Sequence, residues 1–392
     1  MSVVALRTHP FALPLARPFV TARRATHVVE AVLVEAVDEG GRSGWGEAVT
    51  TWRVTGESAA GVEAAVAGPL ADEVVGADPA DASAWAPRLA RAVVGNASAR
   101  AGVEAAVLDL AAREAGLPFA ELIAAELVAA ASGARPGLPS AVRTDMTLSA
   151  ARDVAELDAL VARAARLAGT FGTLKVKVVD APVTRDALVE VRRAVGPAVR
   201  LRVDANQAWD VPTAVRTIAR WQDEGAAVEL VEQPVAVGDL PGLAAVRAVR
   251  LTTVLADEAV RTVEDVEAVA RAGAADAVNV KLTKSGGPLQ ALLVARRALD
   301  LGLAVVVGCM MESTVGIAAA AAVAAIVDAW QGGTVHDLDA GLWLAEPGND
   351  TVRYDGELVV RHAGPGIGPD VAAGVRPVMA DVAATAAREG AR

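Results

Sequence analysis

The stretch TLKVKVVD, residues 173–180, alternates aliphatic and charged positions. In a β-strand this alternation sends Leu174, Val176 and Val178 to one face and Lys175 and Lys177 to the other. A surface hairpin would explain the pattern, because half-exposed strands often carry lysine on the side that faces water. The alternative is that both ammonium groups point into a functional site.

From about residue 140 onward, short apolar runs alternate with stretches of helical periodicity. We expect helices between the strands, such as those at 182–195, 211–225 and 262–273. The strands are expected near 143–147, 173–178, 199–204, 228–232, 252–257, 276–281, 304–309 and 334–337. Eight strands alternating with helices over roughly 200 residues predict an α/β fold with a parallel (β/α) barrel; a doubly wound open sheet is the alternative.

The first part of the chain has a different, α+β texture. Two strand-like runs, 28–37 and 42–49, flank the turn signal DEGG and predict a hairpin. Ser98 is the expected N-cap of a helix that continues to Ala115 and is ended by Gly116 and Pro118.

Three segments follow from these textures. We predict an α+β domain over 1–125, the barrel over 126–345, and a C-terminal segment, 346–392, that packs back on the N-terminal part. The C-terminal segment contains the strand-like run ELVVRH.

Composition narrows the class of protein. Hydrophobic residues make up 53% of the 392 residues and aromatics only 3%, so the core must be built from alanine, valine and leucine. The net charge of -11 argues against nucleic acid as a partner, because phosphate binding needs a basic surface. The longest apolar run, 315–327, is too short and too rich in alanine for a membrane span and predicts a buried helix.

Cysteine usage and the N-terminus indicate the compartment. The single cysteine, Cys309, excludes an internal disulfide framework and any site built from several cysteines. The N-terminal stretch is interrupted by Arg7, Pro10 and Pro14 and does not resemble a signal peptide. We therefore expect a cytoplasmic protein that associates with no membrane.

An ionisable residue closes each of five consecutive predicted strands. Successive separations are 27, 28, 25 and 24 residues, the length of one strand–helix unit. These residues are Lys177, Asp204, Glu232, Asp257 and Lys281. In a barrel they would stand side by side on the carboxyl-terminal rim, where such barrels place their chemistry. Taken singly, each aspartate could be a helix N-cap and each lysine a solvated loop residue; the recurrence favours a site.

The three acidic residues suit a metal ion. Asp204, Glu232 and Asp257 would supply hard oxygen ligands from three adjacent strands and leave open positions, as Mg²⁺ prefers. Lys177 and Lys281 would flank the metal from two sides.

The motifs GWGEA (44–48), DLAAREAGLP (109–118), KVK, DAN, EQP, DE and KLTKSGG together resemble the enolase superfamily, and more closely its muconate lactonizing subgroup. The resemblance covers nearly the whole chain. It implies a modified (β/α)7β TIM-like barrel closed by an N-terminal α+β capping domain, with a Mg²⁺ site and abstraction of a proton α to a carboxylate. Lys281 stands where the mandelate racemase subgroup would place an aspartate, which sets that subgroup aside.

The resemblance also implies roles for the lysines. Lys177 and Lys281 on opposite faces of a substrate would remove and return a proton through a metal-stabilised enediolate. Lys177 would need a depressed pKa, which Mg²⁺ and the ammonium group of Lys175 would favour. Lys175 is expected to tune Lys177 and to help hold the enediolate.

Substrate-binding residues follow from the resemblance to dipeptide epimerases. Asp337 and Asp339 match the pair that receives the α-ammonium group of a dipeptide. Arg24, or its neighbour Arg23, falls where epimerases acting on L-alanyl-glutamate keep an arginine for the side-chain carboxylate, and Thr147 matches a substrate-contacting threonine. The run VGCMMES, 307–313, resembles a segment whose backbone meets the substrate carboxylate.

We therefore expect a Mg²⁺-dependent dipeptide epimerase acting on L-Ala-D/L-Glu, a homo-oligomer with a small-molecule substrate. The enzymatic alternatives are o-succinylbenzoate synthase, N-acylamino acid racemase and muconate cycloisomerase. The alternative of another class is a barrel that binds a ligand without catalysis.

Overall fold

A computed structural model describes residues 1–22, 24–131, 137–346, 351–369 and 371. Its centre is a curled seven-stranded parallel sheet in the order β11-β10-β9-β8-β7-β6-β5. The strands are β5 (Met146–Leu148), β6 (Thr173–Lys177), β7 (Arg200–Asp204), β8 (Val228–Glu232), β9 (Thr253–Ala256), β10 (Ala277–Lys281) and β11 (Ala304–Gly308). Sequential order and parallel pairing are those of a barrel, so the open-sheet alternative is wrong.

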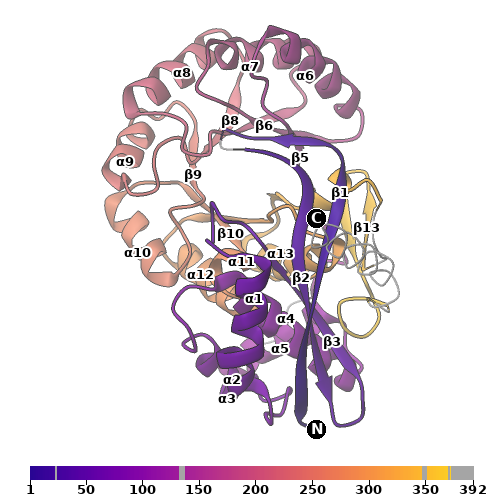
Figure 1. Cartoon of the computed structure of the whole chain (residues 1–392). Coiled ribbons are helices and arrows are strands. Elements are labelled where there is room, and N and C mark those ends of the chain that lie inside the picture. Colours follow the sequence, from indigo (N-terminus) through magenta and orange to yellow (C-terminus); the bar gives the residue numbers. More distant parts are fainter. Residues whose placement is uncertain (23, 132–136, 347–350, 370, 372–392) are drawn as a thin grey trace, which may run out of the picture.

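Helices cover the outside of this sheet, as Figure 1 shows. They are α6 (Val154–Leu167), α7 (Pro182–Val195), α8 (Val211–Asp223), α9 (Leu240–Ala248), α10 (Val263–Ala272), α12 (Pro288–Asp300) and α13 (Thr314–Gln331), with the short α11 (Leu282–Ser285) directly after β10. Each of the long outer helices α6, α8 and α10 begins at a polar N-cap whose side chain accepts a backbone N–H.

Among the described residues, helix α13 is the one helix long and apolar enough to cross a membrane by length and composition alone. Residues Thr314 to Val327 are nevertheless all buried, and the helix packs on β11, α12 and α5. The prediction of a buried helix in this run is confirmed.

The barrel is completed by short strands rather than by one long first strand. The expected strand at 143–147 is divided at Asp145: β5 belongs to the parallel sheet, whereas β4 (Ala141–Thr144) pairs with β12 (Val335–His336) and with β14 (Leu358–Arg361). The N–H group of Cys309 donates to the carbonyl of Asp337 at 3.0 Å, which joins β12 to the end of β11. The prediction of one continuous strand is wrong because its two halves serve two sheets.

The N-terminal cap is a three-stranded antiparallel sheet with helices on one side (Figure 1). Its elements are β1 (Val3–Val20), β2 (Ala25–Asp38), β3 (Ser43–Val49), α1 (Ala59–Ala65), η1 (Val66–Leu70), α2 (Ala71–Val74), α3 (Ala82–Leu89), α4 (Ala97–Ala115) and α5 (Phe119–Ala131). The predicted hairpin of β2 and β3 is confirmed. The tip of the β1–β2 ribbon reaches the barrel, where Ala150 N–H donates to the carbonyl of Val20 at 3.0 Å.

The predicted start of α4 is wrong. Ser98 is a buried residue inside the helix, and its hydroxyl donates to the carbonyl of Val49 at 2.8 Å. The carboxylate of Glu57 instead accepts the N–H groups of Ser98 and Ala99, at 3.0 and 2.9 Å. The predicted end is confirmed, because Gly116 adopts the left-handed conformation that glycine favours.

The C-terminal segment contacts both parts of the molecule. Strands β13 (Val352–Asp355) and β14 form a hairpin, and β14 pairs with β4 of the barrel. Further on, Gly366 accepts a hydrogen bond from Phe119 N–H at 3.1 Å, and Ile367 N–H donates to Asp109 at 2.7 Å. Residues 347–350, 370 and 372–392 of the predicted segment lie outside the described residues.

Candidate active site

Parallel pairing in register explains the regular spacing of the strand-end residues. Lys177 of β6 lies opposite Asp204 of β7, which lies opposite Glu232 of β8. Asp257 directly follows β9. Ligand oxygens of Asp204, Glu232 and Asp257 lie within 4.8 Å of one another, and all three residues are buried. Three converging hard oxygen donors fit a divalent cation such as Mg²⁺.

Each of the three carboxylates is also held by a neighbour that fixes its orientation. Asn206 N–H donates to Asp204 at 2.9 Å, and the side-chain amide of Asn279 donates to Glu232 at 2.9 Å. For Asp257 this neighbour is Lys284, whose ammonium group lies 2.6 Å from Oδ1. Such second partners are typical of metal-binding carboxylates.

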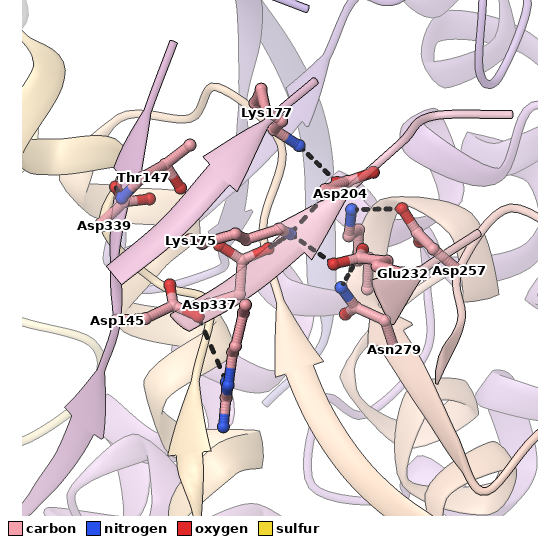
Figure 2. A network of polar contacts seen from close by, with 12 residues as sticks. Asp145, Thr147, Lys175, Lys177, Asp204, Glu232, Asp257, Asn279, Asp337 and Asp339 are labelled. Atoms are coloured by element: carbon pink, nitrogen blue, oxygen red, sulfur yellow. Dashed lines mark hydrogen bonds and ion pairs between the residues drawn. The ribbon is translucent and has the colours of Figure 1, made fainter. Parts of the chain in front are cut away.

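The strand that contains Lys175 and Lys177 is buried on both faces. All five residues of β6 are buried, and the strand lies between β5 and β7, which excludes the surface-hairpin interpretation. Lys175 lies at 2.6 Å from Glu232, 2.7 Å from Asp337 and 3.2 Å from Asp204. Figure 2 shows this ammonium group in the middle of the cluster, whereas Lys177 contacts Asp204 nearer the rim.

On the other side of the cluster, Lys281 of β10 donates to Asp257 at 2.8 Å. The chain has four lysines in all, Lys175, Lys177, Lys281 and Lys284, and every one of them is buried in this cluster. The remaining basic side chains are arginine and histidine.

Burial and pairing shift the pKa values of these groups in opposite directions. Burial would raise the pKa of Asp257, but Lys281 and Lys284 hold it well below its usual range. Burial and the neighbouring Asp204 raise the pKa of Glu232 to about 7. Burial would lower the pKa of Lys175, but Asp337 and Glu232 hold it well above its ordinary value. The cluster is therefore a set of mutually compensating charges.

The eighth-strand pair, Asp337 and Asp339, lies beside this cluster. Asp339 accepts the N–H of Thr147 at 2.7 Å and the indole N–H of Trp343 at 3.0 Å. Burial would raise the pKa of Asp337, but Lys175 and Lys281 lower it to about 2; burial and Asp337 raise the pKa of Asp339. The pKa values of the two carboxylates are therefore shifted in opposite directions, although both side chains line the same cavity.

One cavity at the barrel rim contains most of the residues predicted from the sequence. Cap and barrel both contribute to its lining. The predicted residues in the lining are Arg24, Thr147, Lys177, Asp257, Lys281, Asp337 and Asp339. Lys175, Asp204 and Glu232 belong to the cluster described above but not to this lining. Arg23 lies outside the described residues.

Sequence reasoning missed several residues of the site. Arg53, from the loop after β3, lines the cavity together with Arg24, and Glu258 lines it beside Asp257. Lys284 was missed as well. It follows Lys281 by three residues, and the helical turn α11 between them brings both ammonium groups to Asp257. The spacing of the two lysines within KLTKSGG was the one sequence feature that could have indicated Lys284. Arg53 belongs to a loop without hydrophobic periodicity, so no pattern indicated its position.

Comparisons with known proteins agree with this arrangement. A family model described as the mandelate racemase / muconate lactonizing enzyme N-terminal domain matches residues 4–124, and the enolase C-terminal domain-like model matches residues 156–375. The chain belongs to the mandelate racemase / muconate lactonizing enzyme family. The resemblance and the fold class predicted from the sequence are both confirmed.

Relatives in this family include several epimerases. The chain is 35% identical to the L-Ala-D/L-Glu epimerase of Bacillus subtilis (strain 168) over 372 residues, which cover 94% of this chain and 96% of the relative. It is 34% identical to the L-Ala-D/L-Glu epimerase of Clostridium acetobutylicum, covering 91% of this chain and 95% of the relative.

Solved structures in the family have the same fold. A substrate-liganded complex of the Bacillus subtilis L-Ala-D/L-Glu epimerase matches with a TM-score of 0.85 at 34% identity, covering 94% of this chain and 98% of that one. The dipeptide epimerase of Enterococcus faecalis V583, complexed with Mg and the dipeptide L-Leu-L-Tyr, matches with a TM-score of 0.83 at 29% identity, covering 94% and 99%.

Proposed function

We propose that this protein is a dipeptide epimerase that inverts the α-carbon of the second residue of L-Ala-D/L-Glu. The observation that carries the proposal is that Lys177, Lys281, Asp337 and Asp339 line one cavity at the barrel rim. The two lysines come from β6 and β10, which are separated by three strands of the sheet. Two amines on different sides of a cavity suit removal of a proton from one face of a carbon and its return to the other.

Asp204, Glu232 and Asp257 would hold the metal, and we assign Mg²⁺ to them. Their hard oxygen donors support this assignment, as does the Mg in the Enterococcus faecalis relative. When bound, the ion would stabilise negative charge that develops on the substrate carboxylate and so acidify the α-proton.

The chain's own residues would orient the dipeptide. Asp337 and Asp339 offer carboxylates for the α-ammonium group, and Asp339 is held in place by Thr147 and Trp343. Arg24 from the cap offers a guanidinium group for the glutamate side chain. Lys177 removes the α-proton from one epimer, and Lys281 delivers a proton to the opposite face.

A matched pair of substrates tests this proposal. We would incubate the protein with Mg²⁺ in D₂O and follow the α-proton of the glutamate residue by NMR, with L-Ala-L-Glu and with N-acetyl-L-Ala-L-Glu. Loss of the α-proton signal is expected with the free dipeptide, at a rate at least about tenfold greater than with the acetylated one, because acetylation removes the ammonium group that Asp337 and Asp339 receive.

The variant Asp339→Asn sharpens the test. It should slow exchange of the free dipeptide and leave the slow exchange of the acetylated one nearly unchanged. Faster exchange with N-acyl amino acids than with any dipeptide would replace the proposal with an N-acylamino acid racemase. Absence of exchange with both classes, and with muconate, would favour a barrel that binds without catalysis.

We also propose a cytoplasmic location. The only cysteine, Cys309, is buried and unpaired, which suits a reducing compartment.

A further inference from the structure

The motif GWGEA forms β3, and its two glycines press this strand against helix α4. A Cβ atom on Gly44 would lie 2.3 Å from the carbonyl oxygen of Ala106, and one on Gly46 would lie 2.1 Å from that of Gly102. Only glycine permits so close an approach. Because side chains alternate along a strand, Glu47 points to the face opposite the one that Gly44 and Gly46 turn toward α4.

On that face, the Glu47 carboxylate meets the first turn of barrel helix α13. Its Oε1 accepts the N–H of Ser313 at 2.9 Å, and its Oε2 accepts the N–H of Gly316 at 2.9 Å and the hydroxyl of Ser313. Glu47 is 5% exposed and, within the described residues, has no lysine, arginine or histidine as an ion-pair partner. A cap residue therefore satisfies backbone donors of a barrel helix, where a negative charge is favourable.

The segment directly before this helix is a wall of the active-site cavity. Cys309, Met310 and Met311, which we call the pocket wall, all line the cavity. At one end, the wall is fixed by the hydrogen bond from Cys309 N–H to the backbone carbonyl of Asp337. Beyond its other end, Ser313 N–H donates to the carboxylate of Glu47. Between these points, Met310 N–H donates to Glu312 at 2.8 Å.

Gly316 shows how little space this contact leaves. A Cβ atom there would lie 2.5 Å from Oε2 of Glu312 and 3.2 Å from Oε2 of Glu47. Two buried carboxyl groups thus converge on the start of α13, one from the cap and one from the pocket wall's own connection to the helix.

We infer that Glu47 is a positioning residue that holds the pocket wall from the cap. The catalytic consequence rests on the proposed function, because the wall matters to turnover only if the cavity takes the dipeptide. Glu47 does not line the cavity and acts through Ser313.

The variant Glu47→Gln tests this inference without changing the size of the side chain. Whichever way the amide is turned, its NH₂ group faces a backbone N–H of Ser313 or Gly316 and cannot accept from it. We expect KM for L-Ala-L-Glu to rise about tenfold while kcat stays within about threefold, because a displaced wall weakens binding of substrate and transition state alike.

Glu104→Gln is the matched control. Glu104 is also a buried cap carboxylate, and it accepts the N–H of Leu289 at the start of barrel helix α12, at 2.6 Å, but it does not line the cavity or contact the wall. Its KM should equal that of the wild type. If both variants raise KM equally, the effect comes from weaker docking of the whole cap on the barrel, and the inference is overturned.

Hydrogen–deuterium exchange separates this inference from the proposed function, since it needs no activity. The peptide covering 309–316 should exchange faster in Glu47→Gln than in the wild type or in Glu104→Gln. Unchanged exchange or unchanged KM would overturn the positioning role. If the wild type epimerises no dipeptide, the proposed function fails, and the exchange result alone decides this inference. If Glu47→Gln does not fold, Ser313→Ala should show the same changes at smaller size.

Discussion

Buried carboxylates occur in two regions of this molecule and are stabilised there by different partners. In the barrel, Asp204 and Asp257 face lysine ammonium groups, and their pKa values are lowered. At the boundary between cap and barrel, Glu47 and Glu104 face the backbone N–H groups of helix starts, and burial raises their pKa values. The difference teaches that the ammonium groups beside Asp204 and Asp257 keep these two carboxylates ionised despite burial, whereas backbone donors accompany the carboxylates that join two parts of the fold.

The strongest test of this contrast removes a barrel cation. Lys177→Ala and Lys281→Ala should each lower epimerase turnover by a factor on the order of 10³, because proton transfer by a positioned base contributes about that much. Turnover is measured in H₂O as conversion of one epimer into the other, by NMR of their α-protons, and circular dichroism confirms folding. A variant that keeps more than about a tenth of the wild-type rate would contradict the two-base assignment.

The next test removes a barrel anion. Asp257→Asn should weaken Mg²⁺ binding at least about 100-fold, since it deletes one of three converging ligands. Titration calorimetry with Mg²⁺ alone measures this effect without substrate. Glu104→Gln, which deletes a carboxylate of the boundary, should bind Mg²⁺ as the wild type does; equal losses in the two variants would remove the distinction between the regions.

The smallest effect concerns pH and stability at the boundary. Burial raises the pKa of Glu104 from 4.5 to about 8. Between pH 4.5 and about pH 8, the folded protein therefore holds a proton on this carboxyl group that the unfolded chain has released. The contribution of this group to the free energy of unfolding is therefore fully present below about pH 4.5 and declines as the pH rises to about 8.

Glu104→Gln should lack this decline. Urea unfolding at pH 5, 6.5 and 8 should show the wild type losing stability relative to the variant as the pH rises. Parallel pH profiles for the two proteins would show that Glu104 titrates normally and that the boundary carboxylates are not held by burial.

The sequence was most informative where strands repeat and pair in register. The separations between strand-end residues predict their neighbours because each strand–helix unit returns the chain to the same rim, as the pairing of Lys177, Asp204 and Glu232 demonstrates. Other features depend on contacts between distant residues. Glu57 replaces Ser98 as the acceptor at the start of α4 from 41 residues away, which no local pattern can indicate.

Strand β1 shows a different limit of local rules. Pro10, Pro14 and Pro18 argue against a strand, yet β1 runs from Val3 to Val20. The prolines are tolerated because β1 lies at the edge of the three-stranded sheet and needs donors on one side only. The cavity residue Arg53 was equally hidden, since it belongs to a loop whose place is set by the docking of the cap.

The confinement of all four lysines to the active site has a consequence for chemical labelling. An amine-reactive reagent has only the α-amino group of the chain and these four side chains as targets, and each of the four is at most 8% exposed. Acylation counted by intact-mass spectrometry would therefore report access to the buried lysine cluster and to the cavity that Lys177 and Lys281 line. Protection by a bound dipeptide would appear as a lower number of adducts per chain.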